Sequence, residues 1–184
     1  MGANFREGET ERLEAFSDAI YAIAITLLVL DLYDPTARGS LLLPGLVDEW
    51  PTFFAFATSF MTVLVSWMNH HNMFNYIKRI NRELMLLNGL LLLFVVLTPF
   101  TTSLVSAHLL HPDATVAAAI YCGSWLILSI IHNFLWYNAS HHQLISKHVP
   151  QSQIKRVARE YSIAPIGNAA AFFLAFINAL LQLL

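Results

Sequence analysis

The sequence has little charge of either sign. Asp, Glu, Lys and Arg together make up 12% of its 184 residues, whereas soluble domains usually carry about 25%. A chain that is 57% apolar with so few charges cannot cover a surface that faces water. Its apolar residues fall in long uncharged blocks, and a helix needs about 20 such residues to cross a bilayer. The composition therefore predicts an integral membrane protein.

Clustered basic residues, cysteine pairs and catalytic motifs are also missing. The net charge is −2 and the ten Lys and Arg are dispersed, which argues against a nucleic-acid partner because phosphate binding needs a clustered basic surface. Cys122 is the one cysteine, so no intrachain disulfide can form. The sequence has no phosphate-binding loop, no nucleophile beside a base and no carboxylates paired as a catalytic set within one span. We therefore expect neither an enzyme nor a resident cofactor.

Five apolar blocks predict five complete membrane spans in an all-α subunit. They cover about residues 13–32, 50–69, 84–108, 114–138 and 161–182. In the third block, Pro99 removes one helical hydrogen bond and predicts a kink or an early end of the helix. The polar and basic stretch 141–160 predicts a loop or a helix at the membrane surface. Because no second domain or repeat is evident, residues 1–184 are expected to form a single transmembrane domain.

The fourth block contains a cluster of small residues. Gly123 and Ser124 follow an alanine run at 117–119. Small side chains let the backbones of neighbouring membrane helices approach closely. This part of the block is therefore expected to pack against another helix.

Basic residues lie on one side of the predicted spans. They precede the first block, follow the second and follow the fourth, whereas Arg38 is the only basic residue on the other side. Short cytoplasmic loops are enriched in Lys and Arg. We therefore expect a multi-pass protein of the cell membrane with its N-terminus in the cytoplasm.

The first block differs from the others because its start is polar. Glu14, Ser17 and Asp18 lie in its first third, before an uninterrupted apolar core over 19–30. A core of that length also suits a secretory signal peptide, but no small-residue cleavage site follows it. Ionisable groups within a span are costly unless paired or hydrated, so they mark functional positions. A carboxylate near a helix N-terminus is also favoured by the helix dipole alone, and both readings of Asp18 stay open here.

Angles around the first helix divide its residues between two faces. Successive helical residues differ by about 100°, so Ile23, Leu27 and Leu30 lie within about 60° of one another, while Asp18 is about 140° from Ile23. By itself, the aliphatic stripe is typical of a helix that faces lipid or a protein core. If it faces a symmetry axis instead, Asp18 must point back into its own subunit. The candidate donors there are Trp67, His70, His71 and Asn88.

The histidines indicate metal binding only weakly. His70 and His71 are adjacent, and because neighbouring helical residues diverge by about 100° they cannot easily share one ion. Hydrogen bonding is their expected role. His108 and His111 have a better chelating spacing, but no third ligand is evident. We therefore predict no metal centre and keep His108 and His111 as weak candidates for adventitious zinc.

The first block also carries a recognisable motif. It resembles the Arg-x-x-x-Phe-Ser-Asp helix of transmembrane protein 175, the endosomal and lysosomal potassium channel family. The matching residues are Arg12, Phe16, Ser17 and Asp18. Further shared positions in the second and third blocks are Trp67, His70, His71 and Asn88. The similarity therefore covers most of the chain.

The resemblance implies a potassium-selective cation channel, built in bacteria as a homotetramer of six-helix subunits around a central pore. K+ is the implied permeant ion, and other copies of the chain, monovalent cations and the lipid bilayer are the implied partners. The family's pore is lined by the first helix and narrowed at the positions of Ile23, Leu27 and Leu30. Thr26, about 60° from Ile23, is implied to touch permeating ions. No Thr-Val-Gly-Tyr-Gly filter run occurs in the sequence, as in the family.

Two features fit the resemblance less well. The family has six spans, whereas five complete spans are visible here. The family's Arg, Ser and Asp tie the first helix to its neighbours, but Arg12 lies only about 20° from Ile23 in projection.

Two other functions stay open. A proton-coupled transporter would use Asp18 and the membrane histidines as a relay, although the sequence shows no inverted repeat. An assembly protein without transport is the third alternative. Ohmic current, saturable proton-driven flux and absence of flux distinguish the three.

Overall fold

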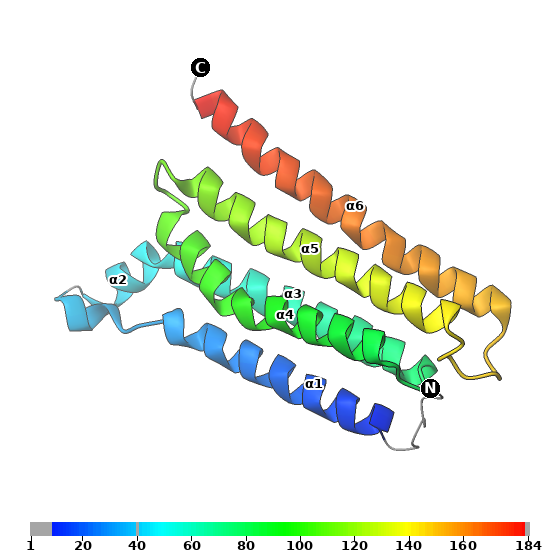
Figure 1. The fold of residues 1–184 in the computed structure, drawn as a ribbon. Coiled ribbons are helices and arrows are strands. Elements are labelled where there is room, and N and C mark those ends of the chain that lie inside the picture. The colour runs from blue at the N-terminus through cyan, green and yellow to red at the C-terminus, as the bar shows by residue number, and fades with distance from the viewer. Residues whose placement is uncertain (1–8, 40, 183–184) are drawn as a thin grey trace.

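Every regular element in the described part of the protein is a helix (Figure 1). The structure is a computed structural model that describes residues 9–39 and 41–182. The α-helices are α1 (Glu9–Leu27), α2 (Leu42–Asp48), α3 (Trp50–Tyr76), α4 (Arg82–His108), α5 (Ala114–His141) and α6 (Gln151–Gln182). Two short 3-10 helices follow α1, namely η1 (Leu28–Asp31) and η2 (Pro35–Arg38). The predicted all-α fold is confirmed.

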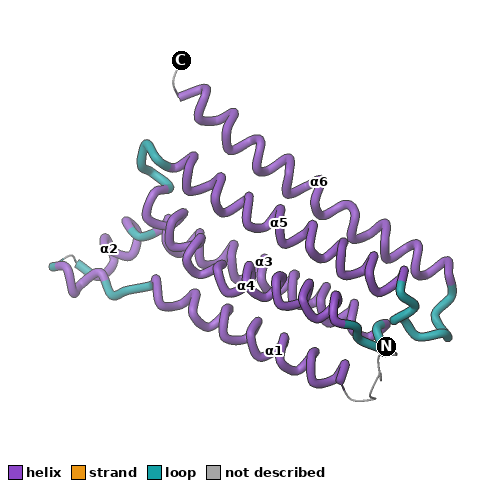
Figure 2. The backbone as a smooth tube through the Cα atoms, viewed as in Figure 1, coloured by secondary structure: helices purple, strands orange, loops and turns teal. Residues whose placement is uncertain are grey.

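The long helices run side by side along one direction (Figure 2). α1 lies at one edge of the bundle and α6 at the other, with α3, α4 and α5 between them (Figure 1). α1 packs against α3 and α4, while α5 packs against α4 and α6. Among the described residues of one chain, α1 is therefore covered on one side only.

The two ends of the bundle differ in charge. One end holds the start of α1 and the α3–α4 and α5–α6 connections (Figure 1), which carry most of the described basic residues together with the first turns of α4 and α6. The two connections are joined by backbone hydrogen bonds, from Lys78 N–H to the Leu144 carbonyl and from Ser146 N–H to the Tyr76 carbonyl, each 2.9 Å. At the opposite end, Arg38 is the only basic residue in the described ranges. The Lys and Arg residues that the sequence predicts on one side of the spans thus lie at one end of the helical bundle.

α3 and α5 are longer than the sequence predicts. Their expected ends are near 69 and 138, yet α3 continues to Tyr76 and α5 to His141. The added turns of α3 bury Met73 and Phe74, and the His70 ring stacks on Phe74 with centroids 4.5 Å apart. Burial within the bundle, and not the polarity of the neighbouring residues, therefore decides where α3 ends.

α6 begins at Gln151, well before the apolar block expected to start at 161. The polar stretch 141–160 thus contains a short connection and then the first turns of α6. In those turns Ile154 and Val157 face the bundle, whereas Lys155 and Arg156 are exposed. An amphipathic pattern of this kind favours a helix that lies along a protein surface. The second half of the stretch is helical and continuous with the last block.

α4 passes through Pro99 and ends at His108, where the predicted span ends, so of the two expectations for Pro99 the early end does not occur. Hydroxyl groups supplement the helical hydrogen bonds around the proline. Thr98 donates to the Phe94 carbonyl at 3.3 Å, and Thr102 donates to the Thr98 carbonyl at 2.8 Å. Neighbouring helices and Thr side chains are what allow a membrane helix to tolerate proline.

Gly123, one of the small residues of α5, packs against α6, as predicted for this cluster. A Cβ atom at Gly123 would lie 3.3 Å from Cε2 of Phe172, which is closer than an ordinary van der Waals contact. Asn168 of α6 also donates to the Trp125 carbonyl at 3.2 Å. The missing side chain at Gly123 therefore sets how closely α6 approaches.

Four helical segments are long and apolar enough to cross a membrane. They are Thr10–Asp31, α3, α4 and α5. α6 is not among them, and its first turns carry Lys155, Arg156 and Arg159. The protein is therefore a membrane protein with at least four helices suited to spanning.

Candidate functional site

One face of α1 is uncovered. Ile23, Leu27 and Leu30 are 58%, 39% and 73% exposed. They recur at helical spacing, so they form one apolar stripe along α1 and η1. The opposite face is buried against α3 and α4 through Tyr21, Ala24 and Leu28. Only lipid or another protein can cover such a stripe.

The buried face of α1 is held by a chain of hydrogen bonds that joins three helices. Asn88 of α4 donates from Nδ2 to Ser17 Oγ at 2.9 Å, and Ser17 donates to the Leu13 carbonyl at 2.8 Å. Asn88 Oδ1 lies 2.8 Å from Nε2 of His70 on α3. Since an amide oxygen only accepts, His70 donates this bond. Ser17, His70 and Asn88 are almost completely buried, so loss of any partner leaves a costly unpaired group.

Asp18 faces α3 and points away from the uncovered stripe. The indole N–H of Trp67 donates to Asp18 Oδ1 at 2.8 Å. A hydrogen bond to an ionised carboxylate is shorter and stronger than a neutral one. Of the four donors considered from the sequence, Trp67 makes this bond, whereas His70 and Asn88 bind each other.

Two further contacts between α1 and α3 were not predicted. Nδ1 of His71 lies 3.1 Å from Oε1 of Glu14, and the Tyr21 hydroxyl lies 3.0 Å from Ser66 Oγ. Glu14 is four residues before Asp18, and Tyr21 is four residues after Ser17. Residues at this spacing share a helix face. The helical spacing therefore predicts that Glu14 faces the same way as Asp18, and Tyr21 the same way as Ser17.

The two remaining motif residues stay outside this network. Arg12 and Phe16 are exposed, on the same side of α1 as Ile23 by helical angle. Arg12 forms no hydrogen bond or ion pair within residues 9–39 and 41–182. The expected role of Arg12 in tying the first helix to its neighbours is therefore not found among these residues of one chain.

Thr26 lies on the uncovered side of α1. Its hydroxyl donates to the Ile23 carbonyl at 2.9 Å, and the side chain is exposed. Because this bond uses the hydroxyl proton, the oxygen keeps acceptor capacity. A hydroxyl in this state can contact a cation or its hydration water.

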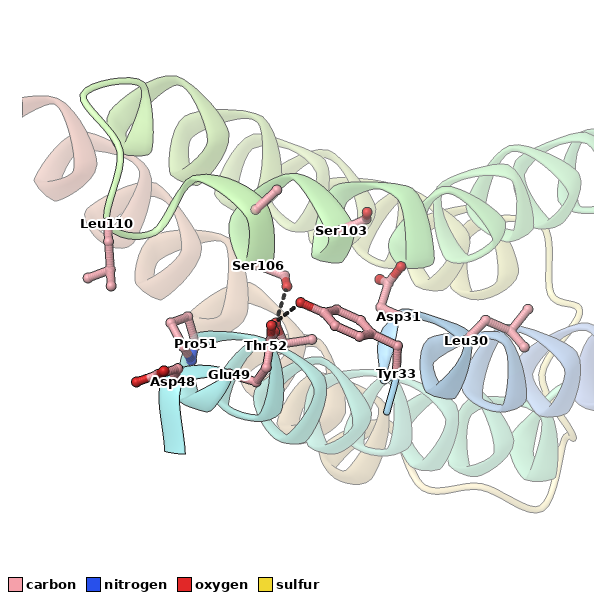
Figure 3. A pocket seen from close by; sticks show the side chains of 11 residues that line it. Leu30, Asp31, Tyr33, Asp48, Glu49, Pro51, Thr52, Ser103, Ser106 and Leu110 are labelled. Atoms are coloured by element: carbon pink, nitrogen blue, oxygen red, sulfur yellow. Dashed lines mark hydrogen bonds between the residues drawn. The ribbon is translucent and has the colours of Figure 1, made fainter. Parts of the chain in front are cut away.

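A cavity of about 550 Å³ opens at the acidic end of the bundle, where Leu30 ends the stripe (Figure 3). Asp31 and Glu49 contribute carboxylates to its lining. Ser106 donates to Thr52 at 2.9 Å, and Thr52 donates to Glu49 at 3.1 Å. Tyr33 and Asp48 also line the cavity, and the Tyr33 hydroxyl donates to Glu49. A concave site with charge of one sign attracts counter-ions, so the carboxylates of this cavity favour cations over anions beside the end of the stripe.

His108 and His111 lie at the same end but do not form a complete metal site. Their ring centroids are 5.6 Å apart. Nδ1 of His108 is bonded to the Leu104 carbonyl at 2.9 Å, and Nδ1 of His111 lies 3.2 Å from Oδ2 of Asp113. No group of three ligand atoms comes together around them in the described ranges.

Known proteins resemble this chain in sequence and in structure. The family described as endosomal/lysosomal potassium channel TMEM175 matches residues 12–99. A potassium channel of Chamaesiphon minutus is 38% identical over 182 residues, which is 96% of this chain and 89% of that protein. The crystal structure of a lysosomal potassium-selective channel TMEM175 homolog from C. minutus superposes with a TM-score of 0.85 over 96% of this chain and 92% of that chain. The human endosomal/lysosomal proton channel TMEM175 is 35% identical over 144 residues, which is 72% of this chain but 28% of the human protein.

The protein has an all-helical membrane fold in which the polar face of α1 is anchored and its apolar face is uncovered. Together with relatives that are named channels, these features define a subunit of the cation-channel class. The matched range contains all the hydrogen-bonded contacts of α1 with α3 and α4 described above. The chain belongs to the TMEM175 family.

Proposed function

We propose that the chain is a subunit of a potassium-selective channel in which four copies place α1 around a central pore. The observation that carries the proposal is the apolar stripe of Ile23, Leu27 and Leu30, which no other part of residues 9–39 and 41–182 covers. Its orientation is held from behind by the bonds of Ser17 and Asp18. Relatives named potassium channels support the same conclusion.

The stripe would act as a hydrophobic constriction. Aliphatic side chains from four copies exclude water when they are close, and such constrictions gate by dewetting. Ions pass when α1 moves outward or turns, or when they lose part of their hydration shell.

Selectivity would come from the cost of dehydration and from Thr26 in place of carbonyl ligands. The sequence contains no Thr-Val-Gly-Tyr-Gly filter run. The Thr26 oxygen keeps acceptor capacity on the uncovered side. A ring of such oxygens favours the cation whose hydration water is replaced by hydroxyl oxygens at the lower free-energy cost.

The basic end of the bundle would face the cytoplasm of a bacterial cell. This orientation follows from the enrichment of Lys and Arg in cytoplasmic segments and places the N-terminus inside. The acidic cavity beside Leu30 then faces the outside and collects cations. α6 would be the fifth span, with its charged first turns at the cytoplasmic surface.

The direct test is planar-bilayer recording of the purified protein with K+ on one side and Na+ on the other. The proposal predicts ohmic single-channel currents with a reversal potential displaced toward that of K+. Channels that do not distinguish the two ions would contradict the selectivity, and absence of current would overturn the proposal.

The constriction is tested by Ile23→Asn. A polar amide at the narrowest ring keeps water in the pore, so K+ flux into liposomes should rise about tenfold or more, since each 1.4 kcal/mol removed from a barrier is tenfold in rate. The matched control is Ile163→Asn, an exposed isoleucine of α6, which should leave flux unchanged. Equal flux from wild type and Ile23→Asn protein would remove Ile23 from the constriction.

Proton-coupled transport is the second candidate. The human relative is named a proton channel, and Glu14, Asp18 and His71 bring three titratable groups together at one end of α1. Carboxylates and imidazoles within spans often relay protons. Flux that saturates and requires a proton gradient would favour this candidate. Ohmic K+ current in the absence of a proton gradient would exclude it.

A further inference from the structure

Three potential metal ligands meet between α1 and α3 at the basic end of the bundle. One ligand atom each from Glu14, Asp18 and His71 lies within 4.8 Å of the other two. Glu14 and Asp18 are four residues apart on one face of α1, and His71 comes from α3. In a tetrahedral zinc site with bonds of about 2.1 Å, ligand atoms are about 3.4 Å apart. The 3.1 Å between His71 Nδ1 and Glu14 Oε1 is already close to this value.

Trp67 orients two of these ligands. Its N–H donates to Asp18 at 2.8 Å, and its ring stacks on His71 with centroids 5.7 Å apart and planes 26° apart. Groups that hold metal ligands in place are a regular part of protein metal sites. The ligand set is therefore supported by a side chain that is itself partly buried against the hydrophobic core.

The polar atoms at this point are incompletely satisfied. Nδ1 of His71 is shielded from solvent and has no hydrogen bond of good geometry, although Glu14 is near. The two carboxylates lie on the same helix face, where like charges repel. Within the described residues, neither Glu14 nor Asp18 forms an ion pair with Lys or Arg. A cation between them would satisfy the nitrogen and compensate the two negative charges.

We propose that Glu14, Asp18 and His71 form a site for a divalent transition-metal ion of the Zn2+ type, which links α1 to α3. One imidazole nitrogen and two carboxylate oxygens suit Zn2+, whereas Mg2+ and Ca2+ prefer oxygen ligands alone. Three protein ligands leave a fourth position for water. The bound ion joins the helix that carries the uncovered stripe to the helix behind it, and this holds whether or not the protein conducts K+.

The test uses the purified full chain after treatment with a chelator. Co2+, which takes the place of Zn2+ and absorbs visible light, should bind once per chain with a saturable visible band, and Zn2+ should displace it. Zn2+ should also raise the temperature of unfolding because it binds the folded state. Mg2+ at the same concentration should do neither. Co2+ absorption that does not saturate would overturn the proposal.

Two variants each remove one ligand while keeping side-chain size nearly constant. Glu14→Gln and His71→Gln should each weaken Zn2+ binding at least about tenfold and abolish the rise in unfolding temperature. The matched control is His108→Ala with His111→Ala, which should leave binding unchanged. Unaltered affinity in either ligand variant, or loss of binding in the control, would assign the ion to another site. If one ligand variant does not fold, the other decides.

Discussion

Trp67 of α3 donates its indole N–H to the carboxylate of Asp18 on α1 at 2.8 Å. This bond joins the helix with the uncovered apolar stripe to the helix that packs behind it. Asp18 lies on the far side of α1 from Ile23, so the same residue that is costly in a membrane acts as an anchor. The bond lies on the buried side of α1 and leaves the stripe on the opposite face.

Trp67→Phe should lower the free energy of unfolding by about 1–3 kcal/mol, since it removes the donor and leaves Asp18 without this partner. Chemical unfolding of the purified protein in detergent measures the change. Trp50→Phe is the control, because Trp50 is exposed near the acidic end and its replacement should cost less than about 0.5 kcal/mol. Equal losses of unfolding free energy in the two variants would mean that the size of the ring, and not the bond to Asp18, contributes to stability.

Asn88 and Ser17 should be energetically coupled through their 2.9 Å hydrogen bond. A double-mutant cycle of Asn88→Ala and Ser17→Ala should give a coupling energy of about 0.5–1.5 kcal/mol. The unfolding free energies of four proteins supply the measurement. Asn72→Ala with Ser17→Ala should be additive, because Asn72 is exposed on α3. Additivity of the Asn88 pair would show that the buried network does not act as a unit.

Thr26→Val should reduce the preference for K+ over Na+ about threefold to tenfold, which corresponds to about 1 kcal/mol of ion interaction. The substitution keeps the shape of the side chain and removes the oxygen on the uncovered side. The shift of the reversal potential under K+ and Na+ gradients measures the effect. Thr62→Val is the matched control, because Thr62 also donates to its own helix, to the Thr58 carbonyl at 2.7 Å. A reversal potential unchanged by Thr26→Val would place selectivity elsewhere.

Gly123→Leu should destabilise the protein by about 1–3 kcal/mol, since a larger side chain must displace Phe172 of α6. Gly167→Leu is the control, because a Cβ at Gly167 meets nothing within 4 Å. Thermal unfolding of both variants makes the comparison. A loss no larger at 123 than at 167 would indicate that α6 adjusts its position at little cost.

Local geometry was enough to divide α1 into two faces. The period of an α-helix is the same in any environment, so the angles separating Asp18 from Ile23, Leu27 and Leu30 could be read from residue spacing. The composition likewise showed that lipid is the solvent, and the placement of Lys and Arg separated the two ends of the bundle. These conclusions depend on rigid backbone geometry and on solvation, which act residue by residue.

The pairing of side chains between helices depended on the tertiary structure. Four donors were compatible with Asp18, and the rotation of α3 against α1 selected Trp67 and placed His71 beside Glu14. α3 and α6 extend beyond the predicted spans for the same reason, because Met73, Phe74 and Val157 are buried by neighbours far away in the chain. How the helices turn toward one another is decided by packing over the whole bundle, and short-range periodicity does not contain that information.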